Sequence, residues 1–88
     1  MKKNQDFWLR TFRELRKLGH PPDKAREALH KLGPSQQQVA DEIGIGRRCY
    51  NNYVAGIRRN RGQQKKIARF WRIPAKEYFA DTYGQRQT

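Results

Sequence analysis

The stretch from Gln36 to Gly56 constrains the fold of this chain more than any other part of the sequence. It holds two short apolar runs at helical spacing, separated by Gly44, and Gly56 ends the second run. A glycine readily adopts the positive φ that a tight turn needs. The pattern therefore predicts two helices of about eight residues joined by a turn of about three or four.

The remainder of the chain also predicts helices, because its apolar residues recur at spacings of three and four and never alternate with period two for long. The expected helices cover residues 6–18, 22–32, 36–43, 47–55, 63–73 and 74–81. Length alone predicts one domain. We expect an all-α fold of five or six helices over residues 1–88, with a core at 23–80 and a loose tail at 84–88.

The same periodicity predicts which side chains face inward. In the first two helices these are Trp8, Phe12, Leu15, Leu18, Ala25, Ala28, Leu29 and Leu32. Later in the chain they are Val39, Ala40, Ile43, Tyr50, Tyr53, Ile67, Phe70 or Trp71, Ile73, Tyr78 and Phe79. Trp8 and Phe12 have a second reading, as part of a dimer surface.

The chain carries a net charge of +12, distributed unevenly. Residues 1–34 hold nine basic and four acidic side chains (+5), residues 35–56 hold two and two (0), and residues 57–88 hold nine and two (+7). Such an excess usually serves binding to a polyanion, although it can be a solubilising surface. Cys49 is the only cysteine, and no apolar run is long enough for a membrane span, so we expect a cytoplasmic protein.

From Ser35 onward the chain resembles the phage-repressor and Cro (Xre-type) helix-turn-helix family. The first matching block is Gln36, Ala40, Gly44, Ile45, Asn52, Tyr53 and Gly56, and the second is Ile67, Ala68, Ile73, Pro74, Tyr78 and Phe79. The likeness covers about residues 23–80 and implies a lambda-repressor-like domain that binds duplex DNA. The helix at 6–18 lies outside it.

The resemblance implies roles for individual residues. Base reading falls to Arg47, Arg48, Asn51 and Asn52 of the second motif helix. Gln36 matches a position that grips a backbone phosphate, and Arg58 matches one that touches phosphate or a base. The chain departs from the family at Gly46, where Ser or Thr usually caps the helix, at Tyr50, which replaces a core Val or Ile, and at Val54, which replaces a frequent Glu. Tyr50 is expected to set that helix a little further out.

The chemistry of these side chains agrees with the implied roles. An arginine pairs bidentately with guanine and an asparagine with adenine in the major groove. The alternatives are that Arg47 and Arg48 clamp phosphates and that Asn51 and Asn52 are solvated. Contacts to phosphates, or else a solvated loop, are expected of Arg58, Arg59 and Arg61. For Lys65, Lys66 and Arg69 the solvated face of a helix is the simpler reading.

Nothing in the sequence predicts catalysis, a cofactor or a metal. The adjacent carboxylates Asp41 and Glu42 fit an exposed helix face, and His20, His30 and Cys49 form no ligand cluster in sequence. We therefore expect a homodimeric, nucleoid-associated transcriptional regulator, more usually a repressor, that binds double-stranded DNA. One alternative is an antitoxin with the same fold, whose protein partner binds the N-terminal helix. Another is an RNA-binding protein that relies on general basicity.

Overall fold

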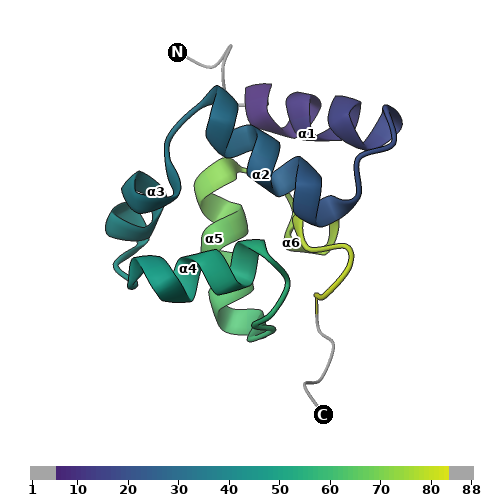
Figure 1. Cartoon of the computed structure of the whole chain (residues 1–88). Coiled ribbons are helices and arrows are strands. Elements are labelled where there is room, and N and C mark those ends of the chain that lie inside the picture. The colour runs from purple at the N-terminus through teal and green to yellow at the C-terminus, as the bar shows by residue number, and fades with distance from the viewer. Residues whose placement is uncertain (1–5, 84–88) are drawn as a thin grey trace.

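The computed structural model describes residues 6–83, and the regular structure in that range consists of helices alone (Figure 1). These are α1 (Phe7–Lys17), α2 (Pro22–Leu32), α3 (Gln36–Ile43), α4 (Arg47–Val54), α5 (Arg61–Trp71) and α6 (Ala75–Tyr78). The all-α prediction is confirmed. The tail predicted to be loose, residues 84–88, lies outside the described residues.

Local sequence chemistry sets most of the helix ends. The Ser35 hydroxyl accepts a hydrogen bond from the Gln38 backbone N–H at 3.1 Å, and the Gln38 side chain accepts one from the Ser35 N–H at 2.8 Å. This reciprocal capping box satisfies two donors at the start of α3 that would otherwise lack partners. Gly19 and Gly44 follow α1 and α3 with φ of 102° and 90°, a conformation that disfavours residues with a Cβ.

The predicted boundaries of the last two helices are wrong. The fifth helix begins at Arg61 rather than at residue 63, because the Asn60 side chain accepts a hydrogen bond from the Gln63 N–H at 3.0 Å and so caps the helix earlier. It ends at Trp71, since Arg72 adopts a left-handed conformation with φ of 59°. The last helix is only the four residues of α6, with Pro74 as its N-cap.

The core draws buried residues from all six helices and is rich in aromatic rings. Trp71 is fully buried, and its ring meets those of Trp8 and His30 edge-on, each with centroids 5.2 Å away. The other fully or almost fully buried apolar residues are Phe12, Ala25, Leu29, Val39, Ala40, Tyr50, Tyr53, Val54, Ile67, Ala68, Ile73, Tyr78 and Phe79. Phe12 is thus a core residue, whereas Trp8 is half-buried against the core.

Two residues predicted to face inward are exposed instead. Leu18 is 74% exposed and Leu32 is 63% exposed. Leu18 stands just past the end of α1 as its C-cap, and Leu32 is the last residue of α2. Helical periodicity continues to the end of each run, but the neighbouring helices that would cover these two side chains do not extend that far.

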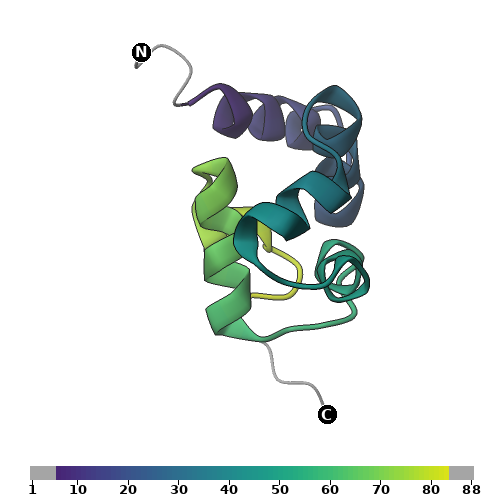
Figure 2. The ribbon, with the colours of Figure 1, turned by 90° about the vertical axis from the view of Figure 1, so that its left-hand side faces the viewer.

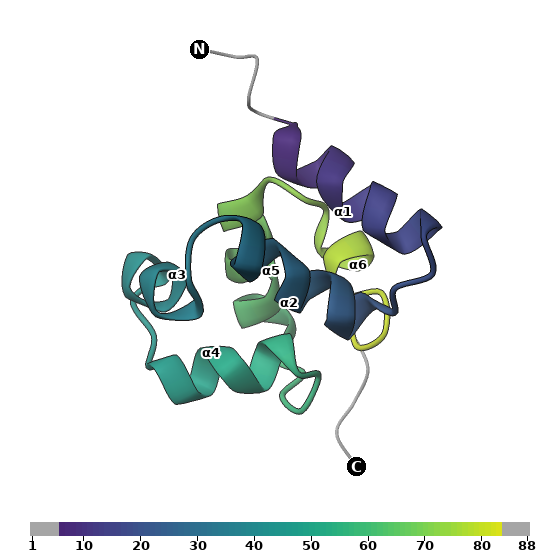
Figure 3. The same cartoon turned by 45° about the horizontal axis from the view of Figure 1, so that its top comes forward.

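The helices form a stack in which α2 separates α1 from α4. Figure 1 shows α1 at the top, α2 below it and α4 at the bottom, and Figure 3 keeps the same order from a second direction. α2 packs against α1 on one side and against α4 on the other, while α3 packs against α4 and α5. The surface that α4 presents is therefore remote from α1.

Candidate nucleic-acid interface

α3 and α4 are joined by the three residues 44–46, as the sequence predicted. The N–H groups of Gly44 and Ile45 both donate to the Ala40 carbonyl oxygen, at 2.8 and 3.0 Å, and so close the end of α3. Ile45 packs against the core and pins the turn. Gly46 is the N-cap of α4 and supplies no side-chain hydrogen bond, so the backbone N–H groups at the start of α4 lack that cap.

The predicted base-reading residues occupy one continuous face of α4. Helical residues advance by about 100° each. From Arg47 at 0°, this rotation puts Asn51, Arg48 and Asn52 at roughly 40°, 100° and 140°, while Tyr50 and Tyr53 fall on the other side of the helix, at roughly 300° and 240°. Burial follows that division, since both tyrosines are buried and both arginines are exposed. α4 thus offers an arc of two arginines and two asparagines.

The two asparagines are less available than the two arginines. Both are half-buried, and the Asn51 Oδ1 atom has neither exposed surface nor a hydrogen-bond partner. Bidentate pairing with adenine needs the oxygen as well as the nitrogen of the amide. In this structure Asn52 is therefore the better placed of the two, and Asn51 would have to turn its amide outward.

Beneath α4, Tyr50 is anchored to α2 and to the segment that precedes α3. The Tyr50 hydroxyl lies 2.9 Å from His30 Nε2, and His30 Nδ1 lies 2.9 Å from the Pro34 carbonyl oxygen. A carbonyl oxygen only accepts, so Nδ1 carries the ring proton, and Nε2 accepts from Tyr50 when His30 is neutral. Burial lowers the pKa of His30, which favours that neutral form, and raises the pKa of Tyr50 to about 12.

The other end of α4 is held by Arg26, a buried residue that the sequence patterns did not single out. Its Nε donates to the Val54 carbonyl oxygen at 2.8 Å, and its Nη1 donates to the Tyr78 carbonyl oxygen at 3.0 Å. Asp81 accepts from both terminal nitrogens, at 2.8 and 3.1 Å. The only signal in the sequence was a charged residue on the same helical face as Ala25 and Leu29.

This network fixes α4 against both α2 and the segment that follows α6. Burial by itself would raise the pKa of Asp81, but hydrogen bonds from Arg26 and its positive charge outweigh that effect and hold the pKa below its ordinary value. Asp81 is therefore ionised at neutral pH and compensates the buried guanidinium. α4 is tied down at Tyr50 and at Val54, so the arc of arginines and asparagines that it carries is held in a fixed orientation.

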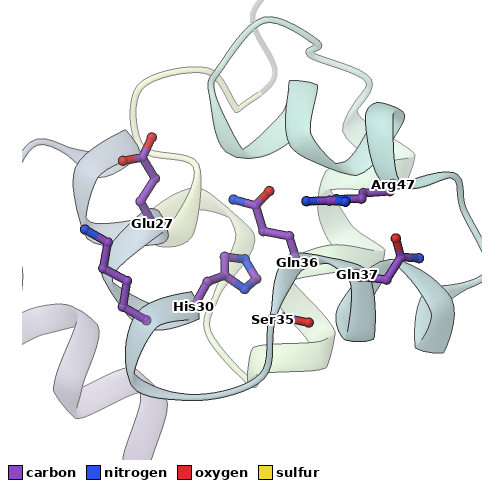
Figure 4. Close-up of a pocket in the computed structure, with 7 residues that line it drawn as sticks. Glu27, His30, Ser35, Gln36, Gln37 and Arg47 are labelled. Carbon is purple, nitrogen blue, oxygen red and sulfur yellow. The ribbon is translucent and has the colours of Figure 1, made fainter.

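Gln36 and Arg47 lie on a common hollow of about 510 Å³ between α2, α3 and α4. Figure 4 shows the Arg47 side chain directed toward that of Gln36, with His30 and Ser35 nearby. Glu27, Lys31 and Gln37 complete the wall. The structure thus brings the predicted phosphate contact of α3 together with the first residue of α4, an association that the spacing in sequence did not predict.

Arg58, Arg59 and Arg61 follow α4 and lie beyond its C-terminal end. Gly56 turns the chain with φ of 84°, and the N–H groups of Ile57 and Arg58 both donate to the Asn52 carbonyl oxygen, at 2.8 and 3.2 Å. Arg58 is exposed and Arg59 is half-buried. Arg61 is exposed as the first residue of α5, with its guanidinium carbon 5.6 Å from the centre of the Tyr83 ring.

The basic residues of α1 belong to a different surface. Arg13 donates to the Glu77 carboxylate on α6 at 2.6 and 2.9 Å, and Arg16 donates to the His20 carbonyl oxygen at 2.9 Å. The ion pair with Glu77 raises the pKa of Arg13. Figure 1 shows α1 and α4 on opposite sides of the molecule, so the positive charge of α1 does not join that of α4.

Within residues 6–83, no three His, Cys, Asp or Glu side chains gather closely enough to hold a metal ion. Likewise, no helix in that part of the chain is long and apolar enough to cross a membrane. Comparisons of the sequence with protein-family models and with curated proteins, and a search of solved structures, give no match. Evidence on function therefore comes from the geometry of the chain itself.

Proposed function

We propose that this protein is a sequence-specific duplex-DNA-binding transcriptional regulator. In this proposal α3 and α4 form a helix-turn-helix unit, α4 is the recognition helix, and the domain is of the lambda-repressor-like kind that the Xre-type resemblance implies. Repression is the expected outcome of binding, since a protein seated on an operator blocks other proteins from it.

The observation that carries the proposal is the outward arc of α4. Two exposed arginines stand at the start of this helix, and two asparagines continue the same face. An eight-residue helix is about 12 Å long, close to the roughly 12 Å width of the major groove. Arg47 and Arg48 present guanidinium forks suited to guanine, and Asn52 presents an amide suited to adenine.

Residues at the two ends of α4 support the same proposal. Gln36 lies beside Arg47 at one end, while Arg58 and Arg61 are exposed beyond the other. A helix seated in the groove brings its two ends toward the two phosphate strands that border it. We infer that these residues grip phosphates and supply most of the affinity, because α3 and α4 with their turn carry no net charge.

The proposal includes a homodimer on DNA, because one recognition helix reads few bases and two-fold symmetric proteins read two half-sites about one helical turn apart. The runner-up function is an antitoxin that binds DNA through α4 and a partner protein through α1. The remoteness of α1 from α4 favours this runner-up, since a partner on α1 would leave α4 free (Figure 3). Co-purification of a toxin with the chain would support it.

Selection of bound sequences from a random duplex pool tests the proposal. The expected result is an enriched motif with two-fold symmetry that contains guanine in each half. An Arg47→Ala/Arg48→Ala variant should lose enrichment at those guanines, whereas the control Arg10→Ala/Lys17→Ala, which removes two charges from α1, should select the wild-type motif. A pool that stays unenriched with the wild-type protein would refute sequence-specific recognition.

A further inference from the structure

A second hollow, of about 320 Å³, lies between α5 and α6 on the side of the molecule away from α4. Figure 2 shows α5 on one side of the view and α4 on the other. The hollow is lined by Lys65, Ala68, Arg69, Ile73, Pro74, Ala75, Lys76 and Tyr83. It shares no residue with the proposed DNA-binding surface, and the two surfaces meet only at Tyr83, whose ring centre lies 5.6 Å from the guanidinium carbon of Arg61.

Three cations surround this hollow without a carboxylate among them. Lys65 and Arg69 are four residues apart on α5 and so lie on one helical face, and Lys76 reaches the same hollow from α6. None of the three forms an ion pair with another described residue, in contrast to Arg13, Lys24 and Arg26. Glu77 follows Lys76 in sequence, but its carboxylate is held by Arg13 on α1.

The surface between these cations is apolar. Pro74 is exposed, Ala75 and Tyr83 are half-buried, and the buried side chains of Ala68 and Ile73 lie beneath them. Lys and Arg side chains are long enough to border such a surface while their charged groups stay in water. Positive charge around an apolar floor is complementary to a ligand with negative charge around an apolar group.

We propose that this hollow is the docking site for an acidic peptide segment of a partner protein, with one large apolar side chain seated on Pro74, Ala75 and Tyr83. The carboxylates that flank this side chain pair with Lys65, Arg69 and Lys76. A duplex phosphate backbone is the weaker occupant, because phosphates need no apolar floor and because this hollow faces away from α4. The proposal does not depend on what α4 binds.

Selection from a random nine-residue peptide library on the immobilised full chain tests the proposal, with affinities of synthetic versions of the enriched peptides then measured by fluorescence anisotropy. The enriched peptides should carry two or more Asp or Glu residues around one large apolar residue. Replacing that apolar residue by alanine should weaken binding about tenfold. Arg69→Gln/Lys76→Gln should weaken it about fivefold, the loss expected for two exposed ion pairs.

A matched control separates the hollow from general basicity. Arg10→Gln/Lys17→Gln removes one arginine and one lysine from α1 and should leave the peptide affinity within about twofold of wild type, because surface pairs elsewhere are screened. Three results would overturn the proposal: no enriched peptide, equal losses in both double variants, or a loss of duplex-DNA affinity in Arg69→Gln/Lys76→Gln as large as its loss of peptide affinity. The last result would assign the hollow to DNA.

Discussion

The guanidinium of Arg26 donates through Nε to the carbonyl oxygen of Val54 at 2.8 Å, although the two residues are 28 positions apart in the sequence. A fully buried cation on α2 thereby fixes the last turn of α4. The same guanidinium reaches Asp81, so three segments of the chain meet at one side chain. The orientation of α4, and with it the direction of its outward arc, depends on this junction.

Arg26→Met should lower the free energy of unfolding by about 3 kcal/mol, since breaking a buried ion pair leaves an uncompensated partner and carbonyl oxygens without donors. Chemical denaturation followed by circular dichroism measures this loss. Asp81→Asn should also destabilise, because it leaves the buried Arg26 guanidinium without its compensating charge and an amide oxygen can accept only one of the two hydrogen bonds. A loss in Arg26→Met below about 1 kcal/mol would contradict the structural role given to this residue.

The hydrogen bond between Tyr50 and His30 predicts a pH dependence of stability. Burial lowers the pKa of His30 in the folded state, so below the ordinary histidine pKa of about 6.5 the unfolded chain binds a proton that the folded chain resists. The free energy of unfolding should therefore keep its full value above about pH 7 and should decrease as the pH drops below about 6.5. Urea denaturation between about pH 7.5 and about pH 5.5 brackets that ordinary pKa and measures the effect.

His30→Gln should flatten that pH dependence, whereas His20→Gln, at the other histidine, should retain it. Asp81 does not interfere in this range, because a carboxyl with a lowered pKa gives up its contribution only below about pH 4. If His20→Gln flattened the profile and His30→Gln did not, the assignment of the pH dependence to His30 would be wrong.

Two glycines should respond to substitution in opposite directions. A Cβ on Gly33 would lie 2.3 Å from the Trp8 ring, so Gly33→Ala should cost about 1–3 kcal/mol as an overpacked contact. A Cβ on Gly46 meets nothing within 4 Å, and Gly46 is the N-cap of α4, so Gly46→Ser should stabilise by about 0.3 kcal/mol. Thermal unfolding of both variants checks these signs, and destabilisation by Gly46→Ser would contradict the proposed cap.

The sequence predicted best what local chemistry decides. Gly19 and Gly44 ended helices, and Ser35 began one, because turns and caps depend on residues that are neighbours in sequence. The exposure of Arg47 and Arg48 on the face away from Tyr53 follows from helical phase alone. These features need no knowledge of the tertiary structure.

What the sequence did not predict depends on distant contacts. Arg26 binds groups 28, 52 and 55 residues away, and no periodicity identifies such partners. Leu18 continues an apolar pattern past the point where a neighbouring helix covers it. Likewise, the position of Asn51 on α4 was predictable, but the covering of its Oδ1 atom was not.

The arginines that follow α4 should contribute to DNA binding differently from Arg47 and Arg48 at its start. Arg58→Ala/Arg61→Ala should weaken binding to every duplex by a similar factor. It should also reduce the magnitude of the slope of log K against log salt by about two, because binding releases about one counterion fewer for each phosphate contact that is lost. Titrations at several salt concentrations measure the slope. An unchanged slope would mean that these arginines do not contact phosphates.

The most direct test of base reading by α4 is the ratio of affinities for the selected duplex and for a scrambled duplex of the same composition, measured at one salt concentration. Arg47→Ala or Arg48→Ala should reduce this ratio by a factor of about 10, since a bidentate pair with a base is worth roughly 1–3 kcal/mol of discrimination. Arg58→Ala should leave the ratio unchanged while it weakens both affinities. If all three variants weakened both duplexes equally and left the ratio intact, α4 would not be reading bases.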